Sequence, residues 1–337
     1  MRKNNFDFLR LLLSILIIIT HSYDLKNNNT TDFLSDFSGF SVAYLTVKSF
    51  FVMSGFLVCN SLLRSYSLLA FYWKRFLRIY PGLFAALCFT ILLLPFAYDK
   101  SFSDYITNKD VYTYIPNNLS LFNLQYTVSG IFENNPFPKV INGSLWTLRY
   151  EFFFYIFISF LFFIKKYHLF LKIFLITVLL SDMVLYFYFT AHNPSSIQIH
   201  FTDLSISIIS GVLFSVFNFH RLNYNYIKII FFVSLLLFFL FARIFDEHYF
   251  LFCQYFIFPF IVICFGLLSI YPLNKINIIG DLSYGIYISA FVIQQFIINF
   301  SPEIHPLNLA IFTFILSSIY AYFSWHFIEI KALNLKK

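Results

Sequence analysis

The sequence predicts an all-α integral membrane protein, a polytopic bundle of about ten transmembrane helices. Of its 337 residues, 59% are hydrophobic and only 12% are charged, and the mean hydropathy is +0.74. Apolar windows long enough to cross a hydrocarbon core of about 30 Å recur along the whole chain. This composition excludes a soluble protein with one buried core.

Ten apolar windows account for these helices, and each is long enough to span a bilayer. They cover residues 6–25, 40–62, 80–98, 146–164, 168–190, 202–219, 226–244, 249–271, 282–300 and 307–328. The longest polar stretch, about residues 98–143, is rich in Asn, Asp, Pro and Tyr and predicts an ordered outer loop. It lacks the apolar content for its own core, so residues 1–337 are expected to form a single domain without an accessory domain.

Lysine and arginine residues are distributed unevenly between the two sides of the predicted bundle. With the N-terminus inside, the cytoplasmic segments hold fifteen of them and the outer loops hold five. Positive charge favours the cytoplasmic side, so both termini are expected there. Arg2 and Lys3 then hold the first window as an uncleaved signal anchor. The pI of about 9.0 reflects anchoring to the lipid bilayer and predicts no nucleic-acid partner.

The four cysteines, Cys59, Cys88, Cys253 and Cys264, all lie in apolar windows. They have neither metal-ligand spacing nor a C-x-x-C pair. The sequence therefore predicts four free thiols that pack as small apolar side chains, without a disulfide framework or a metal site.

Arg10 and His21 are ionisable residues inside or at the end of the first apolar window. Their separation of eleven residues corresponds to about three helical turns, which puts both on one helix face about 16 Å apart. Hydrocarbon disfavours such groups unless they have a water-filled cavity, a partner or a function. The alternative is that Arg10 snorkels to one surface while His21 lies at the opposite interface.

Two further clusters belong to the second and third windows. Ser54 and Gly55, in SFFVMSGFL, are small enough to let another helix or an unwound backbone approach closely, although packing alone also explains them. Arg75 and Arg78, in FYWKRFLRIYP, are one turn apart on the cytoplasmic side, before the third window. Their guanidinium forks match phosphate oxygens, but such pairs also serve as simple helix anchors.

Glu151 lies inside the apolar run of GSLWTLRYEFFFY, slightly deeper than Trp146 at the outer interface. A carboxylate there is costly unless it is paired, so Glu151 is expected to face the bundle interior. Three cations are candidate partners: Arg149, Lys48 and His21. The late motif SWHFIEI carries His326 and Glu329 near the cytoplasmic face, where either can be a helix-end group.

The motifs also have an order. D-x-L-R is followed by ten residues and His, then by FFxxSGFL, RxxRIYP, SLWTLxxExxxY, LSYxIY and a terminal IE, from Asp7 to about Glu329. This set resembles the acyltransferase 3 family of integral membrane acyltransferases. The resemblance implies transfer of an acyl group, usually from acetyl-CoA in the cytoplasm, to a hydroxyl of an extracytoplasmic glycan or lipid-linked saccharide, such as O-antigen or capsule. It also implies a multi-pass protein of the bacterial inner membrane.

The resemblance assigns roles to the polar residues inside the windows. Arg75 and Arg78, together with Arg10, would hold the phosphates of acyl-CoA. His21 would act as a general base toward the sugar hydroxyl or would carry the acyl group covalently, and both routes stay open. Glu151 would orient the imidazole of His21 and stabilise its charged form.

The remaining assignments concern the oxyanion and the acceptor. Ser54, or a backbone amide near Gly55, would face the oxyanion, and Trp146 and Tyr155 are the candidate acceptor-binding residues. Relatives often have a second His after LSYxIY, where this chain has Ala290, so the expected chemistry depends on His21.

A glycan flippase or polymerase is the principal alternative, since such proteins are also polytopic and rich in phenylalanine. They need a glycan cavity, but no arginine pair aligned with an intramembrane histidine. A receptor-like or purely structural membrane protein has no need for ionisable groups at Arg10, His21 and Glu151.

Overall fold

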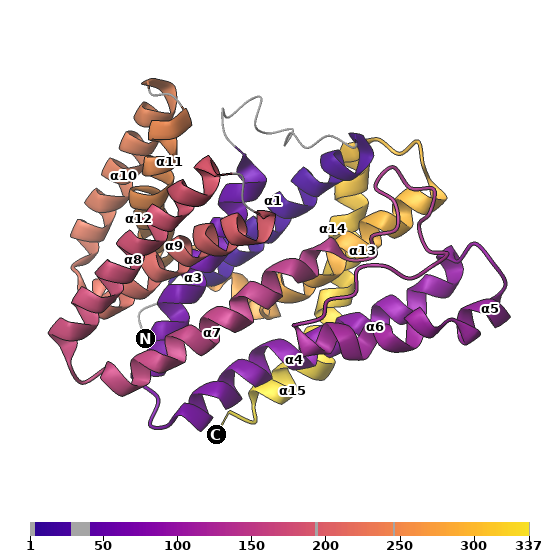
Figure 1. Cartoon of the computed structure of the whole chain (residues 1–337), viewed down its shortest axis with the longest axis horizontal. Coiled ribbons are helices and arrows are strands. Elements are labelled where there is room, and N and C mark those ends of the chain that lie inside the picture. Colours follow the sequence, from indigo (N-terminus) through magenta and orange to yellow (C-terminus); the bar gives the residue numbers. More distant parts are fainter. Residues whose placement is uncertain (1–3, 28–40, 193–194, 245–246, 337) are drawn as a thin grey trace. The chain divides into compact units, whose positions relative to one another are not determined.

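The computed structural model describes residues 4–27, 41–192, 195–244 and 247–336, and these residues form helices joined by loops (Figure 1). Within these ranges there is no β-strand, only an isolated bridge between Tyr98 and Ile131. Nine of the described helical segments are long and apolar enough to cross a membrane. The expected all-α, multi-pass class is confirmed. Arg2, Lys3 and Lys337, which contribute to the predicted orientation, lie outside the described residues.

The helices follow the predicted windows closely. The long ones are α1 (Phe6–Asn27), α3 (Val42–Leu63), α4 (Leu68–Leu93), α7 (Trp146–Ile164), α8 (His168–Ala191), α9 (Ser196–Val216), α10 (Tyr224–Ile244), α13 (Ser283–Phe300) and α14 (Pro306–Ser324). The window at 249–271 instead forms two ten-residue helices, α11 (Glu247–Phe256) and α12 (Phe258–Leu267). Pro259 lies in the first turn of α12, where its missing N–H costs nothing, so a new helix starts there.

Helix α4 begins at Leu68, twelve residues before the predicted window, and contains Pro81. The cations of residues 68–79 interrupt the hydropathy pattern. They do not interrupt the helix, because Lys and Arg are good helix formers. Arg75 and Arg78 therefore lie on the helix itself rather than before it, one turn apart on its first half.

The chain divides into two compact units, which we describe separately. Unit 1 consists of Met1–Arg10, Tyr44–Phe71 and Tyr150–Ile276, and unit 2 consists of Leu11–Ala43, Tyr72–Arg149 and Asn277–Lys337. The single-domain organisation of residues 1–337 stays a prediction.

Helices α3 and α9 pack backbone to backbone within unit 1. A Cβ atom on Gly55 would lie 2.0 Å from the carbonyl oxygen of Ile208, and one on Gly211 would lie 2.0 Å from that of Val52. Only glycine fits at either position. The expected close approach at Ser54-Gly55 is confirmed, and the partner is a helix rather than an unwound segment.

Helices α1 and α13 run side by side in the same direction within unit 2. The Ser14 hydroxyl donates to the carbonyl oxygen of Ser283 at 3.1 Å. About one turn further along α1 and three turns further along α13, the Gln294 amide donates to the carbonyl oxygen of Ile18 at 2.9 Å. The partners advance together along both helices, which fixes the register of α1 against α13.

The polar stretch near residues 98–143 belongs to unit 2 and is ordered, as expected. It contains α5 (Phe102–Thr107) and α6 (Lys109–Ser120). Tyr114 is fully buried, and the side-chain amide of Asn118 donates to the carbonyl oxygen of Gln125 at 3.0 Å. The Gln125 amide in turn donates to the carbonyl oxygen of Asp110 at 2.9 Å.

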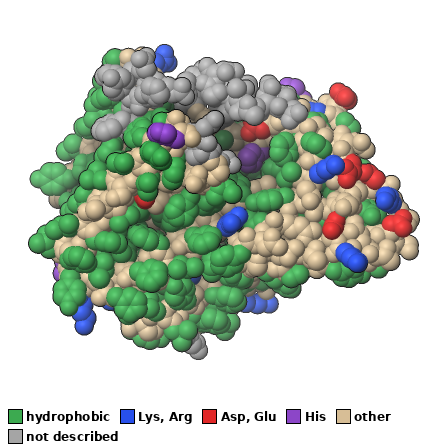
Figure 2. All heavy atoms as spheres, in the orientation of Figure 1, with side chains coloured by type: hydrophobic (Ala, Val, Ile, Leu, Met, Phe, Trp, Pro, Cys, Tyr) green, Lys and Arg blue, Asp and Glu red, His purple; other side chains and the backbone are tan. Residues whose placement is uncertain are grey.

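Large apolar side chains cover much of the surface that Figure 2 shows. Exposed phenylalanines such as Phe163, Phe232 and Phe323 have lipid chains as their natural environment. The four cysteines are free thiols, and three of them are buried while Cys88 is half-buried.

Candidate active site

His21 lies near the end of α1 in unit 2, with 29% of its side chain exposed. Its Nδ1 atom is 3.7 Å from Oδ2 of Asp24, one turn further along the helix. Its ring meets the ring of Phe291 on α13 edge to face, with centroids 5.7 Å apart. Within the described part of the chain, the other carboxylate oxygen of Asp24 is buried without a hydrogen-bond partner. Asp24 is therefore the carboxylate beside His21, the predicted general base, although it is not among the predicted site residues.

Ala290 occupies the position of the second family histidine, and it is buried next to Phe291. It belongs to an apolar cluster with Ile18 and Ile286. The space that a second imidazole would need is thus filled by aliphatic side chains of α1 and α13. The dependence of the chemistry on His21 stays a prediction.

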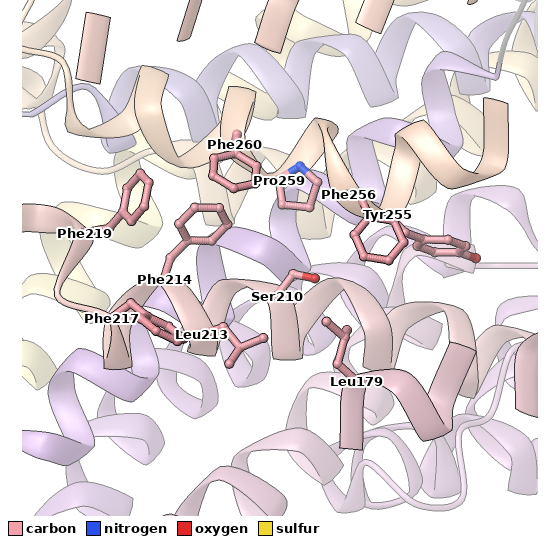
Figure 3. Close-up of a pocket in the computed structure, with 10 residues that line it drawn as sticks. All are labelled: Leu179, Ser210, Leu213, Phe214, Phe217, Phe219, Tyr255, Phe256, Pro259 and Phe260. Carbon is pink, nitrogen blue, oxygen red and sulfur yellow. The ribbon is translucent and has the colours of Figure 1, made fainter. Parts of the chain in front are cut away.

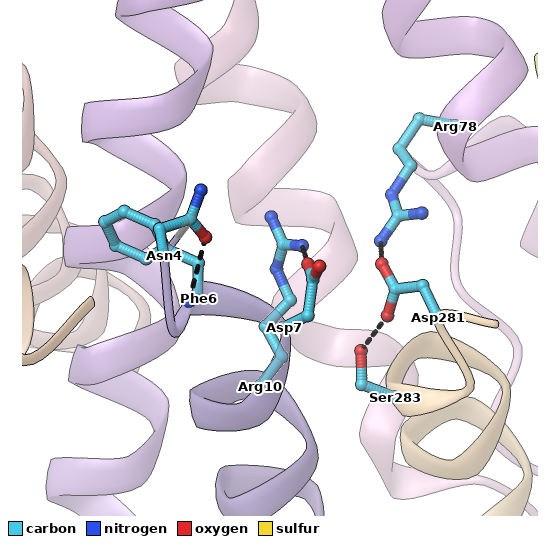
Figure 4. A network of polar contacts seen from close by, with 7 residues as sticks. All are labelled: Asn4, Phe6, Asp7, Arg10, Arg78, Asp281 and Ser283. Atoms are coloured by element: carbon cyan, nitrogen blue, oxygen red, sulfur yellow. Dashed lines mark hydrogen bonds and ion pairs between the residues drawn. The ribbon is translucent and has the colours of Figure 1, made fainter. Parts of the chain in front are cut away.

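Arg78 on α4 forms an ion pair with Asp281, just before α13, with Nη2 and Oδ2 2.5 Å apart. The Ser283 hydroxyl donates to the other oxygen of Asp281 at 2.6 Å (Figure 4). Asp281 directly precedes the LSYxIY motif, and its role as the partner of Arg78 was not predicted from the sequence. The pair holds one of the two predicted phosphate-binding arginines in a defined orientation.

Helix α13 lies beside both Arg78 and His21. Arg78 is tied to its first turn through Asp281 and Ser283, and His21 contacts it at Phe291. Eight residues separate Ser283 from Phe291, so these two levels lie about 12 Å apart along the helix axis. Unit 2 alone therefore contains cations beside the first turn of α13 and, further along α13, the histidine of α1 that packs against it.

Positive charge is concentrated near Arg78. Burial and the cations Arg78, Arg75 and Lys74 lower the pKa of the Lys336 amine to about 8. The Trp73 indole donates to the carbonyl oxygen of Leu335 at 3.2 Å and holds this C-terminal segment on α4. An anion placed here would relieve the repulsion between these cations.

Glu329 is not a helix-end interfacial group, as was considered from the sequence, because it is only 3% exposed. Its Oε1 atom accepts a hydrogen bond from the Ser324 hydroxyl at 2.8 Å, and its carboxyl carbon would lie 3.1 Å from a Cβ on Gly82 of α4. It ends a π-helical turn, Trp325–Glu329. His326 in the same turn is half-buried, with Nδ1 2.8 Å from the carbonyl oxygen of Tyr322.

The start of α7 also meets α13 in unit 2. The hydroxyls of Thr147 and Tyr287 are 2.8 Å apart, and a Cβ on Gly143 would lie 2.7 Å from the Phe291 ring. Trp146, a predicted acceptor-binding residue, therefore begins its helix against the part of α13 that contacts His21.

Glu151 lies in unit 1 and is half-buried. Two other predicted site residues, Ser54 and Tyr155, are hydrogen-bonded to it. It accepts a hydrogen bond from the Ser54 hydroxyl at 3.0 Å and another from the hydroxyl of Tyr155. Helix α3 is unbroken at Gly55, so the backbone amide there serves the helix rather than an oxyanion. Three residues predicted separately thus form one cluster.

Lys48, a candidate partner of Glu151, pairs with Asp203 on α9 instead. Their Nζ and Oδ1 atoms are 3.0 Å apart, with side chains 1% and 0% exposed. Lys48 also donates to Oε1 of Gln254 at 3.0 Å, while Tyr255 donates to Asp203. The nitrogen lies 4.4 Å from the ring centroid of Tyr44. These partners compensate the buried charge of Lys48, while the second carboxylate oxygen of Asp203 is buried without a hydrogen-bond partner among the described residues.

Arg10 pairs with Asp7, one turn earlier on α1, at 3.2 Å (Figure 4). Both residues belong to the D-x-L-R motif and to unit 1. Unit 1 also contains an apolar pocket of about 270 Å³ between α8, α9 and α12, lined by residues such as Phe214, Pro259 and Phe260 (Figure 3). Its lining among the described residues holds no ionised side chain, and its two hydroxyls, of Ser210 and Tyr255, donate to the carbonyl oxygen of Ile206 and to Asp203.

The fold and these clusters define a class of protein: a multi-pass helical membrane protein with charged groups and a histidine inside its spanning helices. The chain belongs to the acyltransferase 3 family, since residues 3–326 match the family described as "Acyltransferase domain". No solved structure matches the chain.

Two relatives are similar to part of the chain. An "O-acetyl transferase" of Shigella phage Sf6 is 32% identical over 155 residues, which cover 46% of this chain and 44% of the relative. "Nodulation protein 10" of Rhizobium leguminosarum bv. viciae is 33% identical over 175 residues, which cover 46% of this chain and 42% of the relative. The matched part therefore spans less than half the length of either relative.

Proposed function

We propose that the protein transfers an acyl group, normally acetyl, from cytoplasmic acyl-CoA to a hydroxyl of an extracytoplasmic glycan or lipid-linked saccharide, in a bacterial inner membrane. The family and the name of the phage relative support acyl transfer. The observation that carries the proposal is the arrangement along α13, with Arg78 tied to its first turn and His21 about 12 Å further on.

Arg75 and Arg78 bind the donor phosphates, and Lys336 adds a third cation at this end of unit 2. A guanidinium fork matches two phosphate oxygens, and Asp281 orients that of Arg78. Arg10 is the fourth proposed donor contact, with Asp7 orienting it.

His21 is proposed to act as the general base. Its neutral imidazole takes the proton of the sugar hydroxyl while that oxygen attacks the thioester carbonyl carbon. The carbon–sulfur bond then breaks, and the imidazolium returns the proton to the departing thiolate. Asp24 stabilises the imidazolium from 3.7 Å. In the second route a nitrogen of the imidazole attacks the thioester carbonyl carbon, the carbon–sulfur bond breaks and the thiolate departs. The sugar hydroxyl then attacks the acyl carbon, the bond to the imidazole nitrogen breaks, and the hydroxyl proton passes to the thiolate.

The Glu151 cluster is proposed to face the acceptor. A carboxylate flanked by the hydroxyls of Ser54 and Tyr155 offers acceptors and donors to a sugar, with Ser54 available to stabilise the oxyanion. Trp146 supplies an aromatic face to the same substrate. The expectation that Glu151 orients His21 stays a prediction, since Asp24 is the carboxylate beside that residue in unit 2.

The test uses the purified full chain in liposomes with acetyl-labelled acetyl-CoA and a surface glycan. Label recovered as an O-acetyl ester on the glycan supports the proposal. Movement or elongation of the glycan without labelling would identify the flippase or polymerase alternative and overturn it.

A further inference from the structure

Unit 1 contains a cavity of about 800 Å³ that none of the residues assigned to acyl transfer lines. Its walls come from the start of α1, the end of α3, the turn before α8, and the 3₁₀ turn η3 (Phe219–Arg221) before α10. Ligand pockets typically measure about 300–1,000 Å³. The size therefore suits a small molecule or a lipid headgroup with part of its chains.

Six basic side chains line this cavity, and no acidic side chain does. They are Arg64, Lys165, Lys166, His168, His220 and Arg221. Among the ion pairs formed by the described part of the chain, none involves these six residues. Several cations gathered without a counter-charge repel one another, so the arrangement favours an anionic ligand.

Neutral groups fix the position of two of these cations. Nε of Arg64 donates to the carbonyl oxygen of Asn60 at 2.9 Å. Nζ of Lys165 donates to that of Ser65 at 3.0 Å and lies 3.9 Å from the ring centroid of Phe162. Because these partners carry no charge, the side chains are oriented while their positive charge stays uncompensated.

The electrostatic effect is visible at His220. Burial, followed by the cations Arg221 and Arg64, lowers the pKa of its imidazole. A bound anion would oppose these two cations and raise that pKa. The same imidazole lies against the ring of Phe56, with centroids 6.4 Å apart, at the boundary between the basic and the apolar lining.

Apart from Asn4, Asn60 and Asn218, the rest of the lining is apolar and includes Phe56, Leu57, Leu171 and Ile227. A small inorganic anion gains nothing from such a wall. A phosphate that carries an apolar chain gains burial of that chain, at about 25 cal/mol for each Å² removed from water.

We propose that this cavity binds a phosphate group at its basic side chains and an apolar chain of the same ligand along its apolar wall. An anionic phospholipid has this chemistry, and a soluble phosphate compound shares its charged part. Lysine and arginine also bind anionic lipid headgroups at membrane surfaces. The site lies in unit 1, whereas Arg75 and Arg78 lie in unit 2, and the proposal does not depend on acyl transfer.

The experiment measures binding of a fluorescent short-chain phosphatidic acid to the purified full chain in neutral detergent, by anisotropy. The test variant carries Arg64→Gln and Arg221→Gln. The matched control carries Lys172→Gln and Lys228→Gln, which remove the same charge outside the cavity. One basic residue near an anionic lipid typically strengthens binding by a factor of about five. Removing two such residues is therefore expected to weaken binding of the lipid to the test variant about 30-fold. The control should bind within about twofold of the parent.

The soluble arm adds inorganic pyrophosphate as a competitor. Weak displacement by millimolar pyrophosphate identifies the lipid as the source of the phosphate, and strong displacement identifies a soluble phosphate compound; either result supports phosphate recognition. Equal affinity of the test variant and the parent would overturn the proposal, as would an equal loss in test and control variants. A melting curve like that of the parent shows that the test variant is folded.

Discussion

The buried pair of Lys48 and Asp203 makes a sharp prediction about unit 1. In Asp203→Asn the charge of Lys48 stays buried, with only the Gln254 oxygen and two aromatic rings to compensate it. Removing one partner of such a pair typically costs about 3–5 kcal/mol, because the remaining charge has lost its counter-ion in a low dielectric. With Lys48→Met added, no charge remains, and the double variant should regain most of the lost stability.

The buried thiols supply the assay. Cys59, Cys253 and Cys264 are fully buried, so a thiol-reactive dye reports unfolding as the purified protein is heated. For a chain of 337 residues at about 2 cal/mol/K per residue, the expected loss lowers Tm by at least about 4 °C.

Asp182→Asn is the matched control. Asp182 is half-buried and accepts a hydrogen bond from the Ser205 hydroxyl at 2.5 Å, and the described structure gives it no cationic partner. Its Tm should change by about 1 °C or less, since a surface-type polar substitution usually changes the free energy of unfolding by about 0.5 kcal/mol. Equal shifts for Asp203→Asn and Asp182→Asn, or a double variant no more stable than Asp203→Asn, would show that Asp203 does not compensate the charge of Lys48.

Three further predictions concern the donor site and the orientation in the membrane. Lysine at Arg75 or Arg78 should raise the acetyl-CoA concentration required for transfer about tenfold, because an ammonium cannot form the bidentate contact; unchanged donor dependence would make the pair a helix anchor. The Lys336 amine has a pKa of about 8, so it is protonated at pH 7 and neutral at pH 9. The affinity of the parent for the anionic donor should therefore fall between pH 7 and 9, while that of Lys336→Met should stay constant. Equal pH profiles of the two proteins would contradict a role of Lys336 in donor binding. In a background without native thiols, an impermeant reagent applied outside should label a cysteine at the exposed Asn123 but not one at the exposed Tyr66, and the reverse pattern would remove the transmembrane polarity on which the proposal depends.

The sequence predicts the helices and part of the site for identifiable reasons. Glu151 and Tyr155 are one turn apart, so a helix alone puts them on one face, and the structure adds Ser54 to them. The predicted start of α4 was wrong, because a hydropathy window ends at polar residues such as Arg75 and Arg78. Arginine is nevertheless a good helix former, so the helix continues through both.

The ion pairs between different helices could not be predicted from the sequence. Periodicity indicates which face of a helix is apolar, but not which neighbouring helix that face meets, so neither Lys48 with Asp203 nor Arg78 with Asp281 was predicted. Asp24 had a local signal, since it lies three residues after His21. It was overlooked because it falls where the apolar window ends.

His21 is proposed to perform the chemistry of acyl transfer, and its replacement by alanine tests that role. Purified His21→Ala in liposomes should transfer acetyl from acetyl-CoA about 10²- to 10⁴-fold more slowly than the parent, with an unchanged melting curve. His192→Ala removes an exposed histidine at the end of α8 and should retain the parent rate. A folded His21→Ala protein that acetylates the glycan at a rate close to that of His192→Ala would contradict the account.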